Sequence, residues 1–392
     1  MAEYHLITSE YPPQPGGVSD YTGLVAAGLG AASDGVHVWC PPSDGVPPNS
    51  PGVAVHRELG RFALADLRRV GKMLNRFSTP RRLLVQWVPH GYGYQSLNLS
   101  FCLWLWSRAT VNRDNVELMV HEPYLAFRDG SWKQSAGAVV HRIMTTILLN
   151  ATHRVWVSIP AWEASWRPYT LGRRIRFAWL PVPSTVPVID DPVAAATIRS
   201  RYAPPGGFLL GHFGTYGRHI SGLLIASLPI LLRGRHDQTV LLLGRGSEAL
   251  REKLIDKHPD LAGRVYVTGA LAASDVSRHL SACDVVIQPF PDGVSSRRTS
   301  LMVGLCHGLP IVTTLGHLTE PFWAESGAVA LAPVGDAVAI LEATERLLAN
   351  PVERGRMGSA AKALYRERFD VGHTIAALRE VCSESRATYS SD

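Results

Sequence analysis

Residues 285–314 read VVIQPFPDGVSSRRTSLMVGLCHGLPIVTT. The segment opens with a short apolar run, passes through a loop rich in proline and glycine, and enters a stretch typical of a helix. A second apolar run follows at 311–314. A strand, a helix and a strand in this order predict two parallel strands joined by a crossover helix.

The same alternation runs along the rest of the chain. Short apolar runs typical of buried strands occur at 4–8, 36–40, 83–88, 116–120, 154–157, 208–213, 240–243 and 265–268. The proline-rich segment 179–192 separates the first five runs from the others. A chain of 392 residues is long enough for two domains. We therefore predict an α/β fold made of two Rossmann-like parallel-sheet domains that face a central cleft.

The pattern also sets the expected boundaries of these domains. The first domain is expected at residues 1–183, a linker at 184–205, the second domain at 206–363, a C-terminal helix at 364–382 and a disordered tail at 383–392.

Composition favours a cytoplasmic protein. The N-terminal residues lack the basic start and apolar core of a signal peptide, and the longest apolar stretch, 222–232, is too short to span a membrane. The five cysteines are scattered without CxxC spacing, which fits reduced thiols.

The positive charge is concentrated in one segment. Eight basic residues and two acidic ones lie between Arg57 and Arg82, so this segment carries the whole formal net charge of +6. A local basic patch predicts an anionic partner, and we expect the inner face of a membrane rather than a nucleic acid. The alternative interpretation is a solvated helix face.

Two polar motifs follow strands of the first domain. Gly16 and Gly17 stand between the first strand and the first helix, where free backbone N–H groups can approach an anion. Their spacing is not the GxGxxG of dinucleotide enzymes, and helix-entry turns often contain glycine. His121 directly follows a strand and could contact a substrate hydroxyl or transfer a proton, although a lone histidine is more often structural.

The loop within residues 288–310 carries the strongest signal. Asp292 is followed by hydroxyl side chains and by Arg297 and Arg298, close to the start of the predicted helix. Arginines in a first helical turn oppose the helix dipole unless an anion meets them, which favours a diphosphate site. The alternative is that these arginines pair with acidic neighbours.

At these segments the chain resembles the retaining GT-B glycosyltransferases, and in particular glycosyltransferase family 4. The resemblance rests on YPPQPGGVSDY near the start, VHEPY after an inner strand, and GHFGTYGR, VLLLGRGSE, VYVTGAL and SACDVVIQPFPDG in the second half. It implies transfer of a hexose-type sugar from a nucleoside diphosphate donor to a hydroxyl acceptor with retention of configuration. It also implies that the last helix crosses back to the first domain.

The resemblance assigns roles by position. His121 and Asp292 are the expected catalytic residues. The expected donor-binding residues are Gly16, Gly17, Arg218, Gly244, Gly246, Ala270, Leu271, Gly293, Val294, Ser295, Ser296, Arg297, Arg298, Thr299 and Ser300. Asp20 and Tyr21 are expected to face the acceptor, which can be a sugar, a lipid-linked molecule or another small molecule.

One departure from the family pattern concerns the donor site. The family commonly carries two glutamates eight positions apart, and here those positions are Asp292 and Ser300. Serine cannot make the charge-assisted contact of a carboxylate with the ribose hydroxyls. No acidic pair suited to a metal lies near the site, so no metal or other cofactor is expected. A non-catalytic binding subunit and a sugar-nucleotide epimerase with the same fold are the alternative functions.

Overall fold

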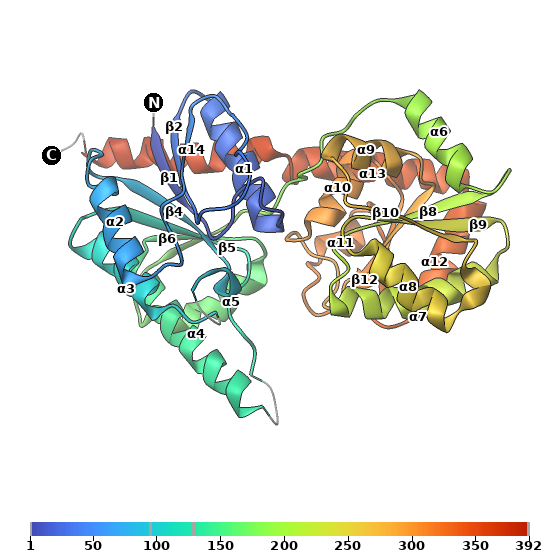
Figure 1. The fold of residues 1–392 in the computed structure, drawn as a ribbon, viewed down its shortest axis with the longest axis horizontal. Helices are drawn as coiled ribbons and strands as arrows, with labels where there is room; N and C mark the ends of the chain where they lie inside the picture. Colours follow the sequence, from blue (N-terminus) through green and yellow to red (C-terminus); the bar gives the residue numbers. More distant parts are fainter. Residues whose placement is uncertain (1, 94–95, 128–130, 390–392) are drawn as a thin grey trace. The chain divides into compact units, whose positions relative to one another are not determined.

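The structure is a computed structural model that describes residues 2–93, 96–127 and 131–389. The chain divides into two compact units: unit 1 contains Met1–Pro181 and Val371–Asp392, and unit 2 contains Val182–Asp370. Each unit has one parallel sheet with helices on both of its faces (Figure 1). The prediction of two Rossmann-like parallel-sheet domains is therefore confirmed.

Unit 1 is built around a seven-stranded sheet in the order β3-β2-β1-β4-β5-β6-β7. Its elements are β1 (Glu3–Ile7), α1 (Gly17–Ala31), β2 (Gly35–Trp39), β3 (Val53–His56), α2 (Leu64–Leu74), β4 (Arg82–Trp87), η1 (Pro89–Gly91), α3 (Leu99–Thr110), β5 (Asn115–Val120), α4 (Trp132–Ala151), β6 (Arg154–Val157), α5 (Pro160–Trp166), η2 (Arg167–Thr170), β7 (Arg176–Trp179) and α14 (Val371–Tyr389). Every residue of β4 and β6 is buried, because helices cover both faces of the sheet.

Unit 2 is built around a six-stranded sheet in the order β10-β9-β8-β11-β12-β13. Its elements are α6 (Pro192–Tyr202), β8 (Phe208–Phe213), α7 (Arg218–Gly234), β9 (Gln238–Leu243), α8 (Ser247–Lys257), η3 (Pro259–Leu261), β10 (Val265–Gly269), α9 (Ala273–Ser281), β11 (Val285–Gln288), α10 (Thr299–His307), β12 (Ile311–Leu315), α11 (Phe322–Glu325), β13 (Ala330–Pro333), α12 (Ala337–Ala349) and α13 (Pro351–Arg368). Leucines and valines of these strands and of α7 and α12 form the core.

The expected linker at 184–205 is wrong, because it contains α6, which packs against α9 within unit 2. Pro192 occupies the first turn of α6, and the Asp191 carboxylate accepts a hydrogen bond from Ala194 N at 3.0 Å. Proline at the first helical position and aspartate at the N-cap are typical of a helix start. The prolines of this segment therefore mark a helix start as well as a connection.

The C-terminal boundaries also differ from those expected. The expected helix at 364–382 is two helices: α13 ends at Arg368 in unit 2, and α14 begins at Val371 in unit 1. Phe369 separates them, because its buried ring stacks on Trp323 at 5.7 Å. The tail expected to be disordered is helical as far as Tyr389, and residues 390–392 lie outside the described residues.

The helix α14 completes unit 1 by packing beside α1, so that helices from the first and last parts of the chain belong to the same unit (Figure 1). Leu378 is fully buried, and its carbonyl accepts hydrogen bonds from Arg82 Nη1 at 2.7 Å and from the Tyr4 hydroxyl at 3.3 Å. Arg379 and Asp34 form an ion pair at 2.9 Å. Unit 1 therefore combines the first part of the sequence with the last helix.

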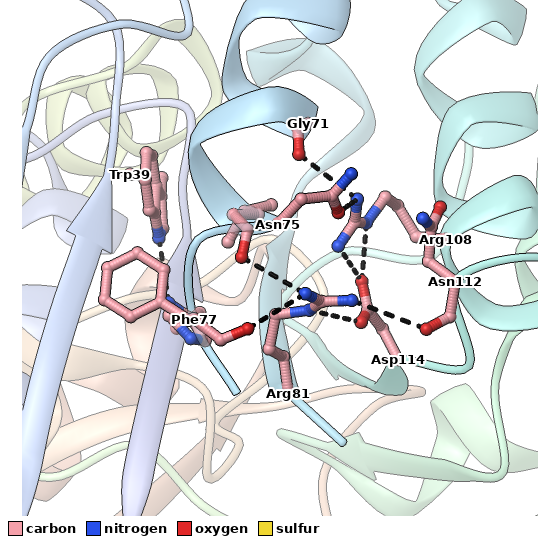
Figure 2. Close-up of polar contacts among 10 residues, drawn as sticks. Trp39, Gly71, Asn75, Phe77, Arg81, Arg108, Asn112 and Asp114 are labelled. Atoms are coloured by element: carbon pink, nitrogen blue, oxygen red, sulfur yellow. Dashed lines mark hydrogen bonds and ion pairs between the residues drawn. The ribbon is translucent and has the colours of Figure 1, made fainter. Parts of the chain in front are cut away.

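A buried ionic cluster fastens α2 and α3 to the amino ends of β4 and β5 (Figure 2). Asp114 accepts from Arg81 Nε at 2.7 Å and from Arg108 Nε at 2.5 Å, and Arg108 Nη1 donates to the Asn75 side chain at 2.7 Å. Arg81 and Asp114 directly precede β4 and β5. The cluster thus lies at the edge of the sheet opposite to the carboxyl ends of its strands.

These contacts change the interpretation of the basic segment 57–82. Arg81 and Arg82 are buried and neutralised by Asp114 and Glu117, so neither faces a partner. Arg69 pairs with Asp66 at 2.7 Å. The exposed cations of the segment that form no ion pair with any described residue are Arg61, Arg68, Lys72 and Arg76.

Candidate active site

The two sheets each have a point where the strand order reverses, between β1 and β4 in unit 1 and between β8 and β11 in unit 2. In open parallel sheets, ligands bind beside such a point, outside the carboxyl ends of the strands. The predicted site residues lie at these edges. Gly16, Gly17 and His121 are at the edge of unit 1, and the residues from Arg218 to Ser300 are at the edge of unit 2.

The loop between β1 and α1 is organised by Glu10. Its carboxylate accepts a hydrogen bond from Ser19 N at 2.9 Å, in the first turn of α1. A Cβ on Gly16 would lie 2.3 Å from Glu10 Oε1, whereas a Cβ on Gly17 would meet nothing within 4 Å. Gly16 therefore makes room for an acidic side chain that already occupies the positive end of the helix.

His121 follows β5 and is almost completely buried. Its Nε2 lies 2.9 Å from Oε1 of Gln86 on the adjacent strand β4, and the Tyr21 ring packs edge-on against it at 4.8 Å. The His121 carbonyl accepts from Trp162 Nε1 at 3.1 Å. These contacts fix the imidazole in one orientation.

Burial lowers the pKa of His121 to about 3, so the ring is neutral at physiological pH. An amide oxygen can only accept, so Nε2 carries the proton and Nδ1 offers a lone pair. A neutral imidazole with one free acceptor can bind a hydroxyl, but it is not a proton donor to a leaving group near pH 7.

The two residues expected to face the acceptor are placed differently. Asp20 is exposed in the first turn of α1. Tyr21 is 2% exposed, and burial raises the pKa of its hydroxyl. Tyr21 therefore packs behind His121 and acts on it as a positioning residue.

In unit 2, the loops after β8 and β9 touch each other. Gly244 has a φ of 112°, and a Cβ there would lie 2.2 Å from the backbone oxygen of Gly214. The Tyr216 hydroxyl donates to the carbonyls of His212 and Leu243, at 3.2 and 3.0 Å, and joins the two loops. Close backbone approach explains the glycine at position 244.

The loop after β8 leads into a helix start that is open to an anion, whereas the first turn of α8 carries Glu248. The helix α7 begins at Arg218 after Gly217, has no side-chain cap and has no acidic residue in its first turn. Gly246, with a φ of 88°, precedes α8. Arg218 and Arg245 are exposed, and neither forms an ion pair with any residue that the structure describes. Positive helix ends with unpaired guanidinium groups attract anions.

The loop after β11 holds an ionic triad. The Asp292 carboxylate pairs with both Arg297 and Arg298, and the Arg298 guanidinium lies over the Phe290 ring at 4.7 Å. Burial would raise the pKa of Asp292, but Arg298 and Arg297 outweigh it and lower the pKa. The carboxylate is therefore ionised at neutral pH. The pairing of these arginines with an acidic neighbour, one of the two interpretations of the sequence, is what the structure contains.

The serines of this loop are turned inward. Ser296 is fully buried, and its N–H and hydroxyl both donate to the Glu320 carboxylate, which also accepts from Trp323 Nε1 at 2.8 Å. Ser295 is fully buried as well. The structure therefore engages the Ser296 donors inside unit 2, and the buried Ser295 hydroxyl has no hydrogen-bond partner among the described residues. The helix α10 begins at Thr299.

The remaining predicted donor residues lie along the same edge of unit 2. Thr299 and Ser300 are half-buried in the first turn of α10, which has no side-chain cap. Gly293 and Val294 are buried in the loop before it. Ala270 and Leu271 follow β10, whose Gly269 is in register with Leu243 of β9.

Sequence reasoning missed the residues that position this machinery. Glu10, Gln86 and Glu320 are polar partners of Ser19, His121 and Ser296, and Arg245 adds a cation between two glycines. Gln86 could have been noticed as the amide within the apolar strand RLLVQW. Within the described ranges, no group of three or more His, Cys, Asp or Glu side chains could hold a metal ion.

Solved structures share this fold across the chain. Sucrose-phosphate synthase from Thermosynechococcus elongatus is 16% identical with a TM-score of 0.77, covering 99% of this chain and 100% of that one. HepE from Anabaena, in complex with UDP, is 16% identical with a TM-score of 0.68, covering 98% and 100%. A trehalose 6-phosphate synthase from Burkholderia multivorans is 14% identical with a TM-score of 0.66, covering 99% and 98%.

The sequence comparisons concern the second unit. A search among curated proteins found no match to the chain. Residues 208–350 match the family described as Glycosyl transferases group 1, and this range runs from β8 to the end of α12. The family match therefore covers unit 2 alone, and over the whole chain the two Rossmann-like units share the GT-B fold of the solved structures.

Proposed function

We propose that the chain transfers a hexose-type sugar from a nucleoside diphosphate donor to a hydroxyl acceptor, with retention of configuration and without a metal. One observation carries the proposal. At the reversal point of the unit 2 sheet, the uncapped start of α7 carries Arg218 after β8, and the uncapped start of α10 follows the Asp292 triad after β11. Arg245 lies in the neighbouring loop after β9. Such an edge is suited to a diphosphate.

The comparisons support a nucleoside diphosphate as the ligand class. The HepE structures contain UDP and UDP-glucose, and the trehalose 6-phosphate synthase shares the fold. In the proposed arrangement, the diphosphate contacts Arg218 and Arg298, and the nucleobase lies against the backbone at Ala270 and Leu271. Gly16 and Gly17 are the proposed donor-binding residues of unit 1, next to the Glu10 carboxylate that accepts from Ser19 N.

The chemistry requires stabilisation of a leaving diphosphate. The bond between the anomeric carbon and the phosphate oxygen breaks, and the acceptor oxygen bonds to that carbon from the same face. The acceptor proton passes to the departing phosphate oxygen. Guanidinium groups and helix N-termini stabilise the negative charge that develops, which is the main catalytic task in such a transfer.

His121 and Asp292 act on the transferred sugar in this proposal. Both accept hydrogen bonds from sugar hydroxyls, His121 through Nδ1 and Asp292 through its ionised carboxylate. The acceptor, whether a sugar, a lipid-linked molecule or another small molecule, binds at unit 1. The contact with an anionic membrane expected from residues 57–82 belongs to the same proposal, through the four exposed cations of that segment.

The first test is a thermal-shift panel of UDP, GDP, ADP, CDP and dTDP without metal. A ligand at about 100 times its Kd stabilises the folded state by about 2.7 kcal/mol, which moves the melting temperature by several degrees. A melting-temperature shift that is clearly largest with one of the five would identify the nucleotide of the donor. No shift with any of the five would favour the non-catalytic binding subunit.

The variant Arg298→Ala tests the diphosphate contact. We expect the best nucleotide of the panel to bind roughly tenfold to 100-fold more weakly, because a charge-assisted hydrogen bond contributes about 1.5–3 kcal/mol. Arg233→Ala is the control, since Arg233 pairs with Asp260 at the other end of α7. Equal nucleotide affinity of Arg298→Ala and the wild type would show that Arg298 does not contact the diphosphate.

Stereochemistry and metal dependence are tested on the product. NMR of the transferred sugar should show the anomeric configuration of the donor, and EDTA should leave the rate unchanged. An inverted product would refute retention, and loss of activity in EDTA would refute the metal-independent mechanism.

A further inference from the structure

The outward face of α3 is apolar. Leu99, Leu103, Trp106 and Thr110 are exposed and recur at the spacing that places residues on one side of a helix. The Leu103 side chain is 51% exposed. A helix that covers a sheet normally presents polar or charged residues to solvent, so this face is the reverse of the expected pattern.

The neighbouring helix α4 repeats the feature. Trp132, Ala136, Val139 and Ile143 are exposed at the same helical spacing, and Trp132 is 77% exposed. The two helices pack side by side on unit 1 (Figure 1). Neither LSFCLWLWSRAT nor WKQSAGAVVHRIMTTILLNA contains an aspartate or a glutamate. We call the seven exposed apolar residues the apolar face: Leu99, Leu103, Trp106, Trp132, Ala136, Val139 and Ile143.

Cations border this apolar face. The helix α2 packs against α3, and its outward side carries Leu64, Arg68 and Lys72 at four-residue spacing. Lys133 stands beside the Trp132 ring, with its Nζ 5.9 Å from the ring centroid. Exposed tryptophan and leucine next to lysine and arginine is the composition of surfaces that lie in the interface of an anionic bilayer.

We propose that α3 and α4 insert the apolar face into the interface of an anionic membrane while the α2 cations contact the lipid headgroups. The inference rests on the membrane contact proposed above from charge alone, but it does not depend on sugar transfer. Charge complementarity favours this occupant, because the border of the apolar face is cationic and both of its helices lack carboxylates. No helix of the described ranges is long and apolar enough to cross a membrane, so the protein would lie on the surface.

The test is co-sedimentation of the full chain with vesicles of phosphatidylcholine alone and with vesicles of equal parts phosphatidylcholine and phosphatidylglycerol. We expect binding to the mixed vesicles, with a partition constant that falls as salt rises. Leu103→Glu and Ile143→Glu should each lower that constant by about tenfold or more, because each replaces an inserted side chain with a charge. The double variant Arg68→Gln with Lys72→Gln should lower it by about 30-fold, which corresponds to about 1 kcal/mol for each cation.

The matched control is Val352→Glu, because Val352 is equally apolar and 80% exposed but lies on α13 in unit 2. This variant should bind as the wild type does. The proposal is overturned if the wild type does not bind the anionic vesicles. It is equally overturned if Leu103→Glu and Val352→Glu have the same vesicle partition constant. It is also overturned if the chain is a dimer that Leu103→Glu dissociates, because a second copy would then cover the apolar face.

The same variants separate this proposal from the proposed function. Thermal shifts with the nucleoside diphosphate panel should be equal in the wild type and in Leu103→Glu, since the substitution lies outside the candidate site. Vesicle binding without any nucleotide shift would leave the membrane proposal standing and refute the donor site. Nucleotide shifts without vesicle binding would refute the membrane proposal and leave the donor site standing.

Discussion

At the scale of single residues, the candidate site depends on close backbone approach. Gly244 adopts a conformation that side-chain-bearing residues rarely adopt, and it lies against the Gly214 carbonyl. Glycine can do this because it lacks a Cβ. The loops after β8 and β9 can therefore pack together only with glycine at this position.

Gly244→Ala should lower the free energy of unfolding by about 1–3 kcal/mol, because the new Cβ meets a backbone atom and the φ is strained. Gly222→Ala is the control: Gly222 lies within α7, and its Cβ would meet nothing within 4 Å. Alanine there should raise stability by up to about 1 kcal/mol. Urea denaturation measures both, and equal effects of the two substitutions would contradict the argument.

At the scale of elements, strands β1, β2 and β3 carry a row of histidines. The rings of His5 and His37 stack at 5.2 Å, His37 Nδ1 lies 3.0 Å from His56 Nε2, and Phe77 packs against His5 and His37. The pKa of His5 is lowered to about 3. Burial is the largest cause, and charge repulsion from His37, His56, Arg81 and Arg108 adds to it. Burial and His37 lower the pKa of His56 to about 4.

This row predicts loss of stability in acid. A histidine with a lowered folded pKa binds its proton more tightly in the unfolded chain, so stability is full above the unfolded pKa of about 6.5. The stability falls as the pH drops from about 6.5 towards the folded pKa values, which are about 4 for His56 and about 3 for His5. Each such group contributes up to about 1.4 kcal/mol per pH unit. Urea midpoints between pH 7 and pH 5 measure the slope.

His5→Gln should flatten this pH dependence, because glutamine retains an acceptor for Trp39 Nε1, which donates to His5 Nδ1 at 3.2 Å, but does not titrate. The absolute stability of the variant does not enter the comparison, since only the slope is compared. An unchanged slope would show that His5 titrates normally in the folded protein.

Elements also differ in how well the sequence predicts them. Strands such as β4, β9 and β11 were predictable because both faces are buried and their sequences are continuous apolar runs. The edge strands β3, β7 and β13 were missed, because VAVH, RFAW and ALAP are short and partly exposed. Their strand character comes from pairing with a neighbour, which no local pattern contains.

At the scale of the whole molecule, unit 1 depends on the last helix of the chain. Deleting residues 371–392 removes the carbonyl of Leu378 that Arg82 and Tyr4 use, and it uncovers α1. We expect the calorimetric transition of unit 1 to move to lower temperature or vanish, while the transition of unit 2 remains. Deleting only 390–392 is the control and should change neither. A truncated chain that melts as the full one does would contradict this dependence.

The sequence by itself determined the parallel α/β class, the two series of strands and the polar loops at their ends, because these follow from local periodicity and from turn residues. Tertiary structure decided which polar groups are satisfied within the fold. Ser296 meets Glu320, and Arg81 meets Asp114, across segments that are distant in sequence. Tertiary structure also turned Tyr21 inward and left the apolar face of α3 and α4 outward. A local pattern gives a residue's element and face, but only packing shows which other segment lies against that face.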